Sequence, residues 1–221
     1  MEFFISMEKK FRQEIPMHHP AIDLIERRVS ANRFDPLHSL TNTEIEGLVR
    51  LATRAPTAFN LQNWRFIAVR KAEAKAKLRD LAYGQVKVSD AAVTFIICGQ
   101  SPDHESLGER LRPFVETGLM PEAMASGWQE TARAKYAADS EASRDEAIRS
   151  ATLGTATLIY AAEAMGLASG PVSGFDAAAV SREFGLAGGE IPVMLLPVGR
   201  AAPGNWPQKP RRPLSEVLQL S

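Results

Sequence analysis

The twelve-residue segment 55–66 (APTAFNLQNWRF) constrains the fold more than any other part of the chain. It places turn formers, short polar side chains and amides between an amphipathic helix and a strand. Pro56 predicts the end of that helix, because the residue before a proline is pushed out of the α region. Asn60 and Gln62 each offer donors and acceptors, which suits the edge of a heteroaromatic ring. On these residues alone, an ordinary helix-to-strand loop is the alternative.

Composition places the chain among ordinary globular proteins. Its 221 residues, 45% hydrophobic and 24% charged, fit one domain or one domain with an insertion. The 26 basic residues balance the 26 acidic ones, so no overall field favours nucleic acid or an anionic membrane. Cys98 is the only cysteine, so no intramolecular disulfide can form, and its apolar surroundings predict a buried strand residue.

The start of the chain and its hydropathy predict a cytoplasmic protein. No apolar stretch approaches the ~20 residues that cross a bilayer. An acid precedes the first short apolar run and lysines follow it, which is the wrong order for a secretory signal. Residues 1–19 are expected to form a mobile N-terminal arm that could wrap a partner subunit, and residues 20–221 a single domain.

Helical and strand periods alternate along the chain and predict an α+β domain in which helices dominate a small sheet. A capping-box spacing of Thr41 and Glu44 marks the start of the helix before the 55–66 segment. Gly166 suits the position after the end of a long helix. Further helices are expected over residues 21–28, 72–82, 144–165 and 177–184. Strands are expected over residues 65–70, 93–98 and 191–199.

Two segments lack a clean period. Within residues 101–145, aromatic side chains lie among charged residues and glycines, so we expect helices with an aromatic face that is not simply core. This segment is the candidate helical lid or substrate wall, with Trp128 first and Phe114 and Tyr136 behind it. The alternative is that Trp128 only packs the helices together. Residues 201–221 form a proline-rich C-terminal extension, expected to lie across a subunit surface.

Standard catalytic motifs are missing from the sequence. There is no G-x-G-x-x-G after a strand and no G-x-x-x-x-G-K-[ST], which disfavours Rossmann and P-loop sites. The histidines lack zinc-ligand spacing. In residues 170–174 the serine stands one place late for a nucleophile elbow, and no histidine follows it. Metal and acyl-transfer chemistry are therefore disfavoured, and no side chain is assigned a catalytic role.

A dispersed set of phosphate-binding and amide groups remains. Arg28, Ser30 and Asn32 alternate, so in extended chain they would point one way. A guanidinium and a hydroxyl on one side suit a terminal phosphate. Backbone N–H groups near Gly174 could donate to a ring nitrogen. Two cations stand one residue apart in the stiff tail: Lys209 and Arg211. The alternative for Arg28, Ser30 and Asn32 is a basic helix end. The alternative for the Gly174 turn is a plain C-cap, and that for Lys209 and Arg211 is a solvated tail.

In this order, these pieces resemble the nitroreductase superfamily, dimeric flavoenzymes that hold FMN at the subunit interface. The family pattern has "Arg-Arg/His-Ser-x-Arg/Lys-x-Phe", then "Ser-x-x-Asn-x-Gln-Pro-Trp", "Pro-x-x-Gly-Phe" after a long helix, and "Lys-x-Arg-x-Pro" after the last strand. This chain offers RRVSANRF, TAFNLQNW, PVSGF and KPRRP at the corresponding places. The resemblance spans residues 22–218. It implies a nitroreductase-like fold, with a small mixed or antiparallel sheet surrounded by helices, in an intertwined homodimer.

The resemblance also implies which residues bind FMN. The phosphate would be held by Arg28, Ser30, Lys209 and Arg211, and the partner subunit would supply Pro56, Thr57, Ala58 and Asn60. The whole implied set is Arg28, Val29, Ser30, Asn32, Pro56, Thr57, Ala58, Asn60, Gln85, Lys87, Val172, Ser173, Gly174, Lys209 and Arg211. Asn32 would meet the pyrimidine edge of the ring. Backbone amides of Ser173 and Gly174 would lie near flavin N5 and O4.

The chain departs from the family pattern at four of these motif positions. It has Val29 for a polar residue, Asn32 for a cation, Asn63 for proline and Ser173 for the frequent glutamate. The phosphate ligands survive, so FMN binding is still expected. Without a cation near the N1/O2 edge, the anionic reduced flavin would be stabilised less, and the reduction potential of the flavin would be lower.

The implied activity is that of an FMN-dependent oxidoreductase. NADH or NADPH would deliver hydride to flavin N5 and leave, and a nitroaromatic, quinone or similar acceptor would then bind in the same place, which is a ping-pong mechanism. Reductive dehalogenation or flavin fragmentation on the same fold is one alternative. A flavin-binding protein without turnover is another. The expected partners are a second copy and a small-molecule acceptor, with neither nucleic acid nor membrane.

Overall fold

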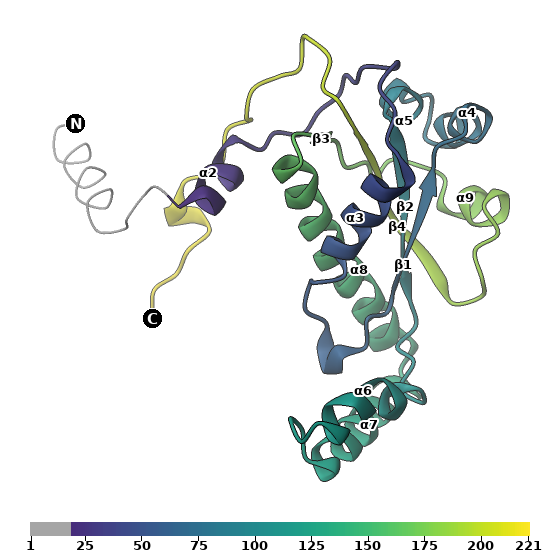
Figure 1. Cartoon of the computed structure of the whole chain (residues 1–221), viewed down its shortest axis with the longest axis vertical. Helices are drawn as coiled ribbons and strands as arrows, with labels where there is room; N and C mark the ends of the chain where they lie inside the picture. The colour runs from purple at the N-terminus through teal and green to yellow at the C-terminus, as the bar shows by residue number, and fades with distance from the viewer. Residues whose placement is uncertain (1–18) are drawn as a thin grey trace, which may run out of the picture.

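A four-stranded antiparallel sheet forms the centre of the computed structural model, which describes residues 19–221 (Figure 1). The strand order is β1-β2-β4-β3. The bounds are β1 Trp64–Val69, β2 Val93–Gln100, β3 Ala168–Ser169 and β4 Glu190–Gly199. The three expected strands are confirmed, each with small shifts at its ends. Strand β3 escapes prediction because two residues can show no alternating period.

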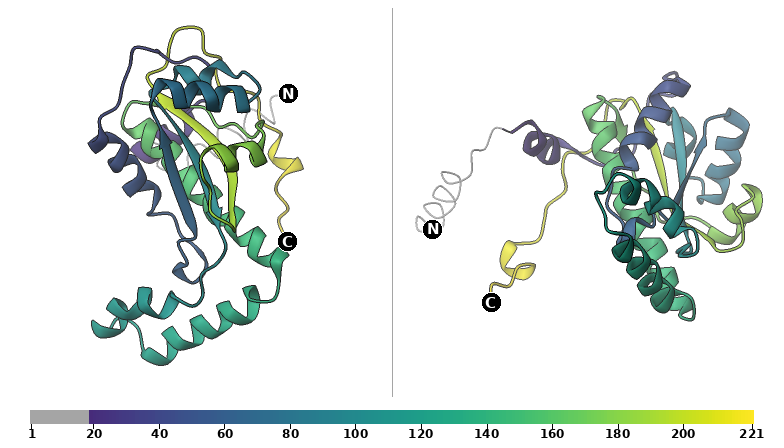
Figure 2. Two further views of the ribbon diagram at one scale, coloured as in Figure 1. Left: turned by 90° about the vertical axis from the view of Figure 1, so that its right-hand side faces the viewer. Right: turned by 60° about the horizontal axis from the view of Figure 1, so that its bottom comes forward.

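Strand β2 is buried on both faces and therefore needs cover on both sides. Phe95 and Ile97 pack into one apolar cluster, while Ile96 and Cys98 pack into another on the opposite face. The helices that cover the first face are α3 (Asn42–Ala52) and α8 (Ser140–Ala164). Those that cover the second are α4 (Ala72–Leu81), α5 (Val86–Asp90) and α9 (Ala177–Glu183). Figures 1 and 2 show the resulting helix–sheet–helix layers.

The long central helix α8 begins earlier than the sequence pattern predicts. Its N-cap is Asp139, whose carboxylate accepts from the backbone N–H groups of Glu141 and Ala142 at 3.0 and 2.9 Å. The first turn carries no apolar face, so hydrophobic periodicity cannot reveal it. The segment 101–145 thus includes the first turn of α8. Gly166 follows the helix with φ 73°, as expected for a residue after a C-terminus.

Helix α8 lies unusually close to the sheet at Gly99. A Cβ at this position would lie 2.5 Å from the carbonyl oxygen of Ala147, which real side chains do not tolerate. Glycine therefore allows α8 to cross directly over the end of β2. Helix α3 covers the same face, and its predicted capping box is present, with reciprocal hydrogen bonds between Thr41 and Glu44.

Two helices lie apart from the other layers, below the lower end of the sheet in Figure 1. They are α6 (Leu107–Glu116) and α7 (Glu122–Tyr136), and their presence confirms the helices expected in this segment. They share an apolar cluster with Leu61 from the loop before β1. Tyr136 is buried there and its hydroxyl donates to Glu146 at 3.2 Å, which ties α7 to α8.

The described ends of the chain, residues 19–27 and 201–221, contain no buried residue. The predicted N-terminal arm, residues 1–19, lies outside the described residues except for His19, which caps α2 (Pro20–Arg27). The C-terminal extension is exposed and contains one short 3₁₀ turn, Leu214–Glu216. Among residues 19–221, no helix combines the length and hydropathy needed to cross a membrane.

Cys98 offers a direct chemical test of this packing. Its side chain is fully buried in β2, and burial raises the pKa of the thiol to about 12. Because the thiolate is the reactive form, the native protein should react with an aromatic disulfide reagent at neutral pH only as fast as it unfolds. Protein denatured in guanidinium should react at once and release one equivalent of the reagent's aromatic thiolate per chain. Stoichiometric reaction of the native protein within seconds would contradict this placement.

Candidate functional site

The chain after helix α2 lies against the sheet in extended form. Arg28 is the extended residue that ends α2, and its Nη1 lies 3.4 Å from the hydroxyl of Ser30. Ala31 donates its backbone N–H to the carbonyl oxygen of Ser169 at 2.9 Å. A Cβ on Gly170 would lie 2.1 Å from the Ala31 carbonyl oxygen, so only glycine permits this contact. The structure thus brings Arg28 and Ser30 together, as their alternation suggests.

Helix α5 connects this segment to the turn before α9. The Lys87 ammonium lies 3.4 Å from Asn32 Oδ1, and the Gln85 amide donates to the carbonyl oxygen of Gly174 at 2.8 Å. Val172 pairs with Leu195 of β4, which fixes the turn, while Ser173 and Gly174 are exposed. Predicted site residues from three distant segments therefore adjoin one another, with Val29 half-buried between Arg28 and Ser30.

The side chain of Asn205 joins the C-terminal segment to the extended chain at Asn32 and Arg33. Its Oδ1 accepts from the backbone N–H groups of Asn32 and Arg33 at 2.7 and 3.0 Å. Its Nδ2 donates to the carbonyl oxygens of Arg33 and Ala202 at 2.8 and 2.9 Å. One side chain thus satisfies four backbone groups, and it fixes the distance between the N-terminal segment and the tail.

The tail beyond Asn205 brings two more cations to this group. Gln208 donates to the carbonyl oxygen of Arg28 at 3.2 Å and accepts from Arg211 at 2.9 Å. Lys209 lies with its ammonium 5.5 Å from the centre of the Trp206 ring. Arg212 instead pairs with Glu216 at 2.9 Å. The neighbouring arginines therefore have different partners, and only Arg211 is linked to the Arg28 segment.

We call Arg28, Lys87, Lys209 and Arg211 the basic cluster. Burial lowers the pKa of Lys87, and the positive charge of Lys209 lowers it further. A cleft of about 340 Å³ opens beside the cluster between Asn32 and Trp206. Like charges held together beside a half-buried ammonium are unfavourable unless an anion is shared between them. The cluster is therefore suited to an anionic ligand.

The amide-rich loop before β1 lies at the other end of the sheet (Figure 1). At that end Trp64 pairs with Gly99, whereas the basic cluster adjoins the end where Val93 pairs with Val198. Strand β2 has eight residues and spans roughly 25 Å. One chain therefore does not bring the predicted residues Pro56, Thr57, Ala58 and Asn60 to the basic cluster.

The backbone of this loop is strained. Phe59, Asn60 and Gln62 have φ of 51°, 57° and 50°, the left-handed region that residues other than glycine seldom adopt. The Gln62 N–H donates to the Thr57 hydroxyl at 3.0 Å and closes the loop. Strain of this kind persists only where the surroundings impose it, and it is common at functional sites.

The three aromatic candidates have different environments. Trp128 is half-buried on α7 and packs edge-on against Phe59, with ring centres 6.1 Å apart. Phe114 is 49% exposed on α6. Tyr136 is 5% exposed and bonded to Glu146, so it does not face a surface. Of the three candidates, Trp128 is the one whose ring packs against an aromatic ring of the strained loop, and we call α6 and α7 the helical pair.

Sequence reasoning does not find Asn205 and Gln208. Asn205 follows Gly204, whose φ is 88°, and an asparagine beside a glycine reads as an ordinary turn. Its backbone partners at Asn32 and Arg33 lie more than 170 positions away in the chain, and no local spacing signals such contacts. Trp206 has the same difficulty, because a lone aromatic residue in a proline-rich tail has no period.

Comparison with proteins of known family and structure gives a consistent result. The model of the Nitroreductase family matches residues 25–200. YodC of Bacillus subtilis, placed by its name among NAD(P)H nitroreductases, is 29% identical over 197 residues, covering 89% of this chain and 96% of its own. A Thermus thermophilus protein named NADH dehydrogenase is 33% identical over 177 residues, covering 78% of this chain and 84% of its own.

Solved structures give the same fold. A nitroreductase-like protein from Streptococcus mutans matches with a TM-score of 0.82 and 26% identity, covering 90% of this chain and 97% of its own. A protein from Exiguobacterium sibiricum, solved in complex with FMN, matches with a TM-score of 0.83 and 25% identity, covering 92% and 98%. The predicted nitroreductase-like fold is confirmed.

Asn205→Ala tests whether this amide fixes the site. Removing the acceptor of the Asn32 and Arg33 N–H groups should raise their hydrogen-exchange rates by about tenfold, because a lost hydrogen bond costs about 1–1.5 kcal/mol. Gln219→Ala is the matched control, since Gln219 is an exposed amide of the same tail. Exchange measured by mass spectrometry on peptides that contain residues 28–34 reports the result. Unchanged protection in the Asn205 variant would contradict the assigned role.

Proposed function

We propose that this chain, which belongs to the Nitroreductase family, is an FMN-dependent oxidoreductase that takes hydride from NADH or NADPH and passes it to a small-molecule acceptor. The observation that carries this proposal is the basic cluster beside the cleft at Asn32 and Trp206. The FMN complex of the Exiguobacterium protein and the name of the Thermus relative support the cofactor and the donor.

The residues of the cluster fit a flavin mononucleotide. A phosphate would offset the repulsion between Lys87 and Lys209, and it would be bound by Arg28, Ser30, Lys209 and Arg211. Asn32, Lys87 and Gln85 would contact the polar edge of the ring or its ribityl chain. The backbone N–H groups of Ser173 and Gly174 would complete the set from the turn that Val172 anchors to β4.

FMN supplies the hydride chemistry when bound, and the protein binds, orients and tunes it. Asn32 places a neutral amide where the family pattern has a cation, and Lys87 lies against that amide. The pyrimidine edge would thus be faced by one half-buried ammonium, that of Lys87. Fewer positive charges there stabilise an anionic reduced ring less, so the chain's own residues favour a lower reduction potential.

The same geometry supports a site shared by two copies of the chain. Within one chain, the amide-rich loop before β1, which we call the Asn60 loop, lies at the opposite end of β2 from the basic cluster. A second copy would bring its own loop, with Pro56, Thr57, Ala58 and Asn60, to the flavin of the first. The strained φ values of this loop fit a segment shaped for contact outside its own subunit. The exposed tail could then lie on the partner's surface.

The acceptor would be a flat aromatic compound, such as a nitroaromatic or a quinone. Trp128 and Phe114 are the aromatic side chains of the helical pair that have exposed surface. The helical pair packs against the strained loop through Trp128 and Phe59. In the shared site, this wall would meet the acceptor opposite the partner's flavin.

Two neighbouring arginines test the phosphate assignment. Arg211→Ala should weaken FMN binding roughly ten- to a hundredfold, because one charge-assisted contact contributes about 1.5–3 kcal/mol. Arg212→Ala is the matched control, since Arg212 pairs with Glu216 instead. Fluorescence titration of apoprotein with FMN measures both affinities. Equal losses in the two variants would show that the phosphate is bound elsewhere.

Trp128→Ala tests the substrate wall. Aromatic stacking contributes about 0.5–1.5 kcal/mol beyond burial, so KM for aromatic acceptors should rise several-fold while FMN content stays normal. Tyr136→Phe is the control for packing, because it removes only the hydroxyl bonded to Glu146. That variant should lower the melting temperature and leave KM unchanged. If Trp128→Ala behaves like Tyr136→Phe, Trp128 only packs the helices.

A further inference from the structure

Trp206 is a large aromatic residue that stands mostly in solvent at the cleft beside the basic cluster. It is 64% exposed, and it lines the cleft together with Asn32 and Lys209. It lies three residues before the Lys-x-Arg-x-Pro motif and is not part of it. An aromatic side chain that buries so little surface contributes little to the stability of the fold. Its place at the cleft therefore calls for a reason other than packing.

The backbone at Trp206 is fixed by the residues on both sides of it. Gly204 has φ 88°, and a Cβ at this position would lie 3.1 Å from the Arg33 guanidinium. Asn205 then forms its four hydrogen bonds to backbone groups. Pro207 follows, and a proline restricts the residue before it to extended conformations. The exposed indole thus stands on a backbone whose position is defined.

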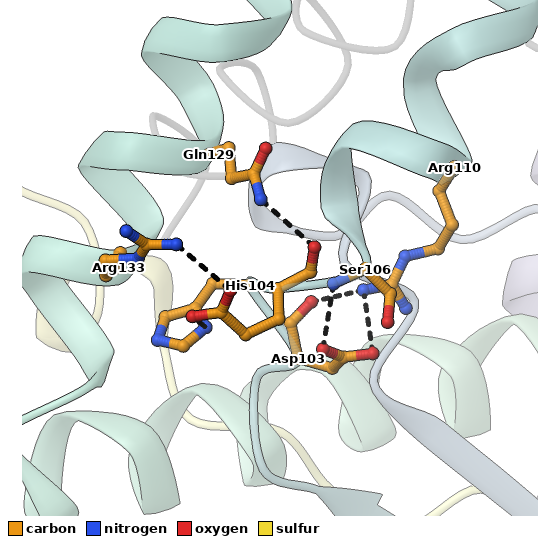
Figure 3. A network of polar contacts seen from close by, with 7 residues as sticks. Asp103, His104, Ser106, Arg110, Gln129 and Arg133 are labelled. Atoms are coloured by element: carbon orange, nitrogen blue, oxygen red, sulfur yellow. Dashed lines mark hydrogen bonds and ion pairs between the residues drawn. The ribbon is translucent and has the colours of Figure 1, made fainter.

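The Lys209 ammonium lies against this indole. It is 5.5 Å from the centre of the Trp206 ring, within the ~6 Å over which an aromatic face attracts a cation. Cations elsewhere in the chain pair with carboxylates, as the Arg110 guanidinium does with Asp103 at 3.4 Å (Figure 3). Lys209 forms no ion pair within residues 19–221, and the acidic residue nearest to it in sequence, Glu216, pairs with Arg212. The ring takes the place of a carboxylate.

A second ammonium repels Lys209. Burial lowers the pKa of Lys87, and the positive charge of Lys209 lowers it further, so the two charges act on each other. This repulsion favours conformers in which the long, flexible Lys209 side chain turns into solvent. The negative potential on the face of the Trp206 indole opposes it. The ring therefore keeps a cation in the basic cluster before any anion has bound there.

We propose that Trp206 is a positioning residue, whose indole face holds the Lys209 ammonium at the cleft in place to bind a phosphate. The proposal rests on the proposed function in taking that phosphate from FMN. A lysine that is already held loses less side-chain freedom when the phosphate binds, and the affinity is higher for it. The effect of Trp206 thus depends on Lys209 and on the phosphate, which distinguishes it from a residue that contacts the flavin ring.

Trp206→Leu is the sharpest test, because it removes the aromatic face and keeps an apolar side chain. Fluorescence titration of the full-length apoprotein should show FMN binding weakened roughly two- to fivefold. Riboflavin, which is FMN without its phosphate, should bind with unchanged affinity. Trp206→Phe keeps an aromatic face and should restore most of the loss. Lys135→Met is the matched control, since it removes an ammonium 5.2 Å from the Tyr136 ring on α7, and it should change neither affinity.

A double-mutant cycle tests the dependence on Lys209. In the Lys209→Met background, Trp206→Leu should cause no further loss of FMN affinity. A further loss there, equal losses for FMN and riboflavin, or an unchanged FMN affinity in Trp206→Leu would each overturn the proposal. Melting curves verify that the variants fold, which the exposure of Trp206 favours.

A measurement without flavin keeps this proposal separate from the proposed function. In NMR spectra of the apoprotein, the ring current of the indole should shift the Lys209 Hε signals upfield, and Trp206→Leu should abolish the shift. Protein that shows this shift but binds no flavin would overturn the proposed function and support the positioning of Lys209. Protein that binds FMN but lacks the shift would overturn the positioning and leave the proposed function intact.

Discussion

The burial of strand β2 is the constraint on which the rest of the structure depends. Every residue from Val93 to Gly99 is buried, so both faces of the strand must be covered. Helices α3 and α8 meet this need on one side, and α4, α5 and α9 on the other. Burying this much apolar surface is the main favourable term in folding. The layers in turn decide which segments reach the two ends of the sheet, where the basic cluster and the amide-rich loop lie.

The chemistry at one end of the sheet follows from hydrogen bonds between chain segments that are distant in sequence. Phe34 bridges to Ala201, Asp35 N–H donates to the Arg200 carbonyl oxygen at 3.0 Å, and Asn205 holds Asn32 and Arg33. These contacts draw basic side chains of a chain with no net charge into one cluster. Their mutual repulsion is the physical basis for expecting an anionic ligand there.

Local signals predicted much of this architecture, and contacts distant in sequence account for what they missed. The capping box at Thr41, the apolar period of β2 and the glycine after α8 each act within a few residues, so the sequence alone places them. Ordered motifs predict Arg28, Ser30 and Gly174, and the family resemblance predicts Lys87, on segments that the fold brings together. The start of α8 at Ser140 was missed because its first turn has no apolar face. The role of Asn205 depends on tertiary contacts that leave no local pattern.

The central claim is that FMN binds between the basic cluster of one chain and the Asn60 loop of another. Sedimentation velocity of the purified protein, recorded both at the protein band and at the visible absorbance of flavin, tests it most directly. The account predicts that the flavin absorbance sediments entirely with a species of twice the chain mass. Flavin that sediments with a single chain, or protein that binds no flavin at all when FMN is added, would contradict it.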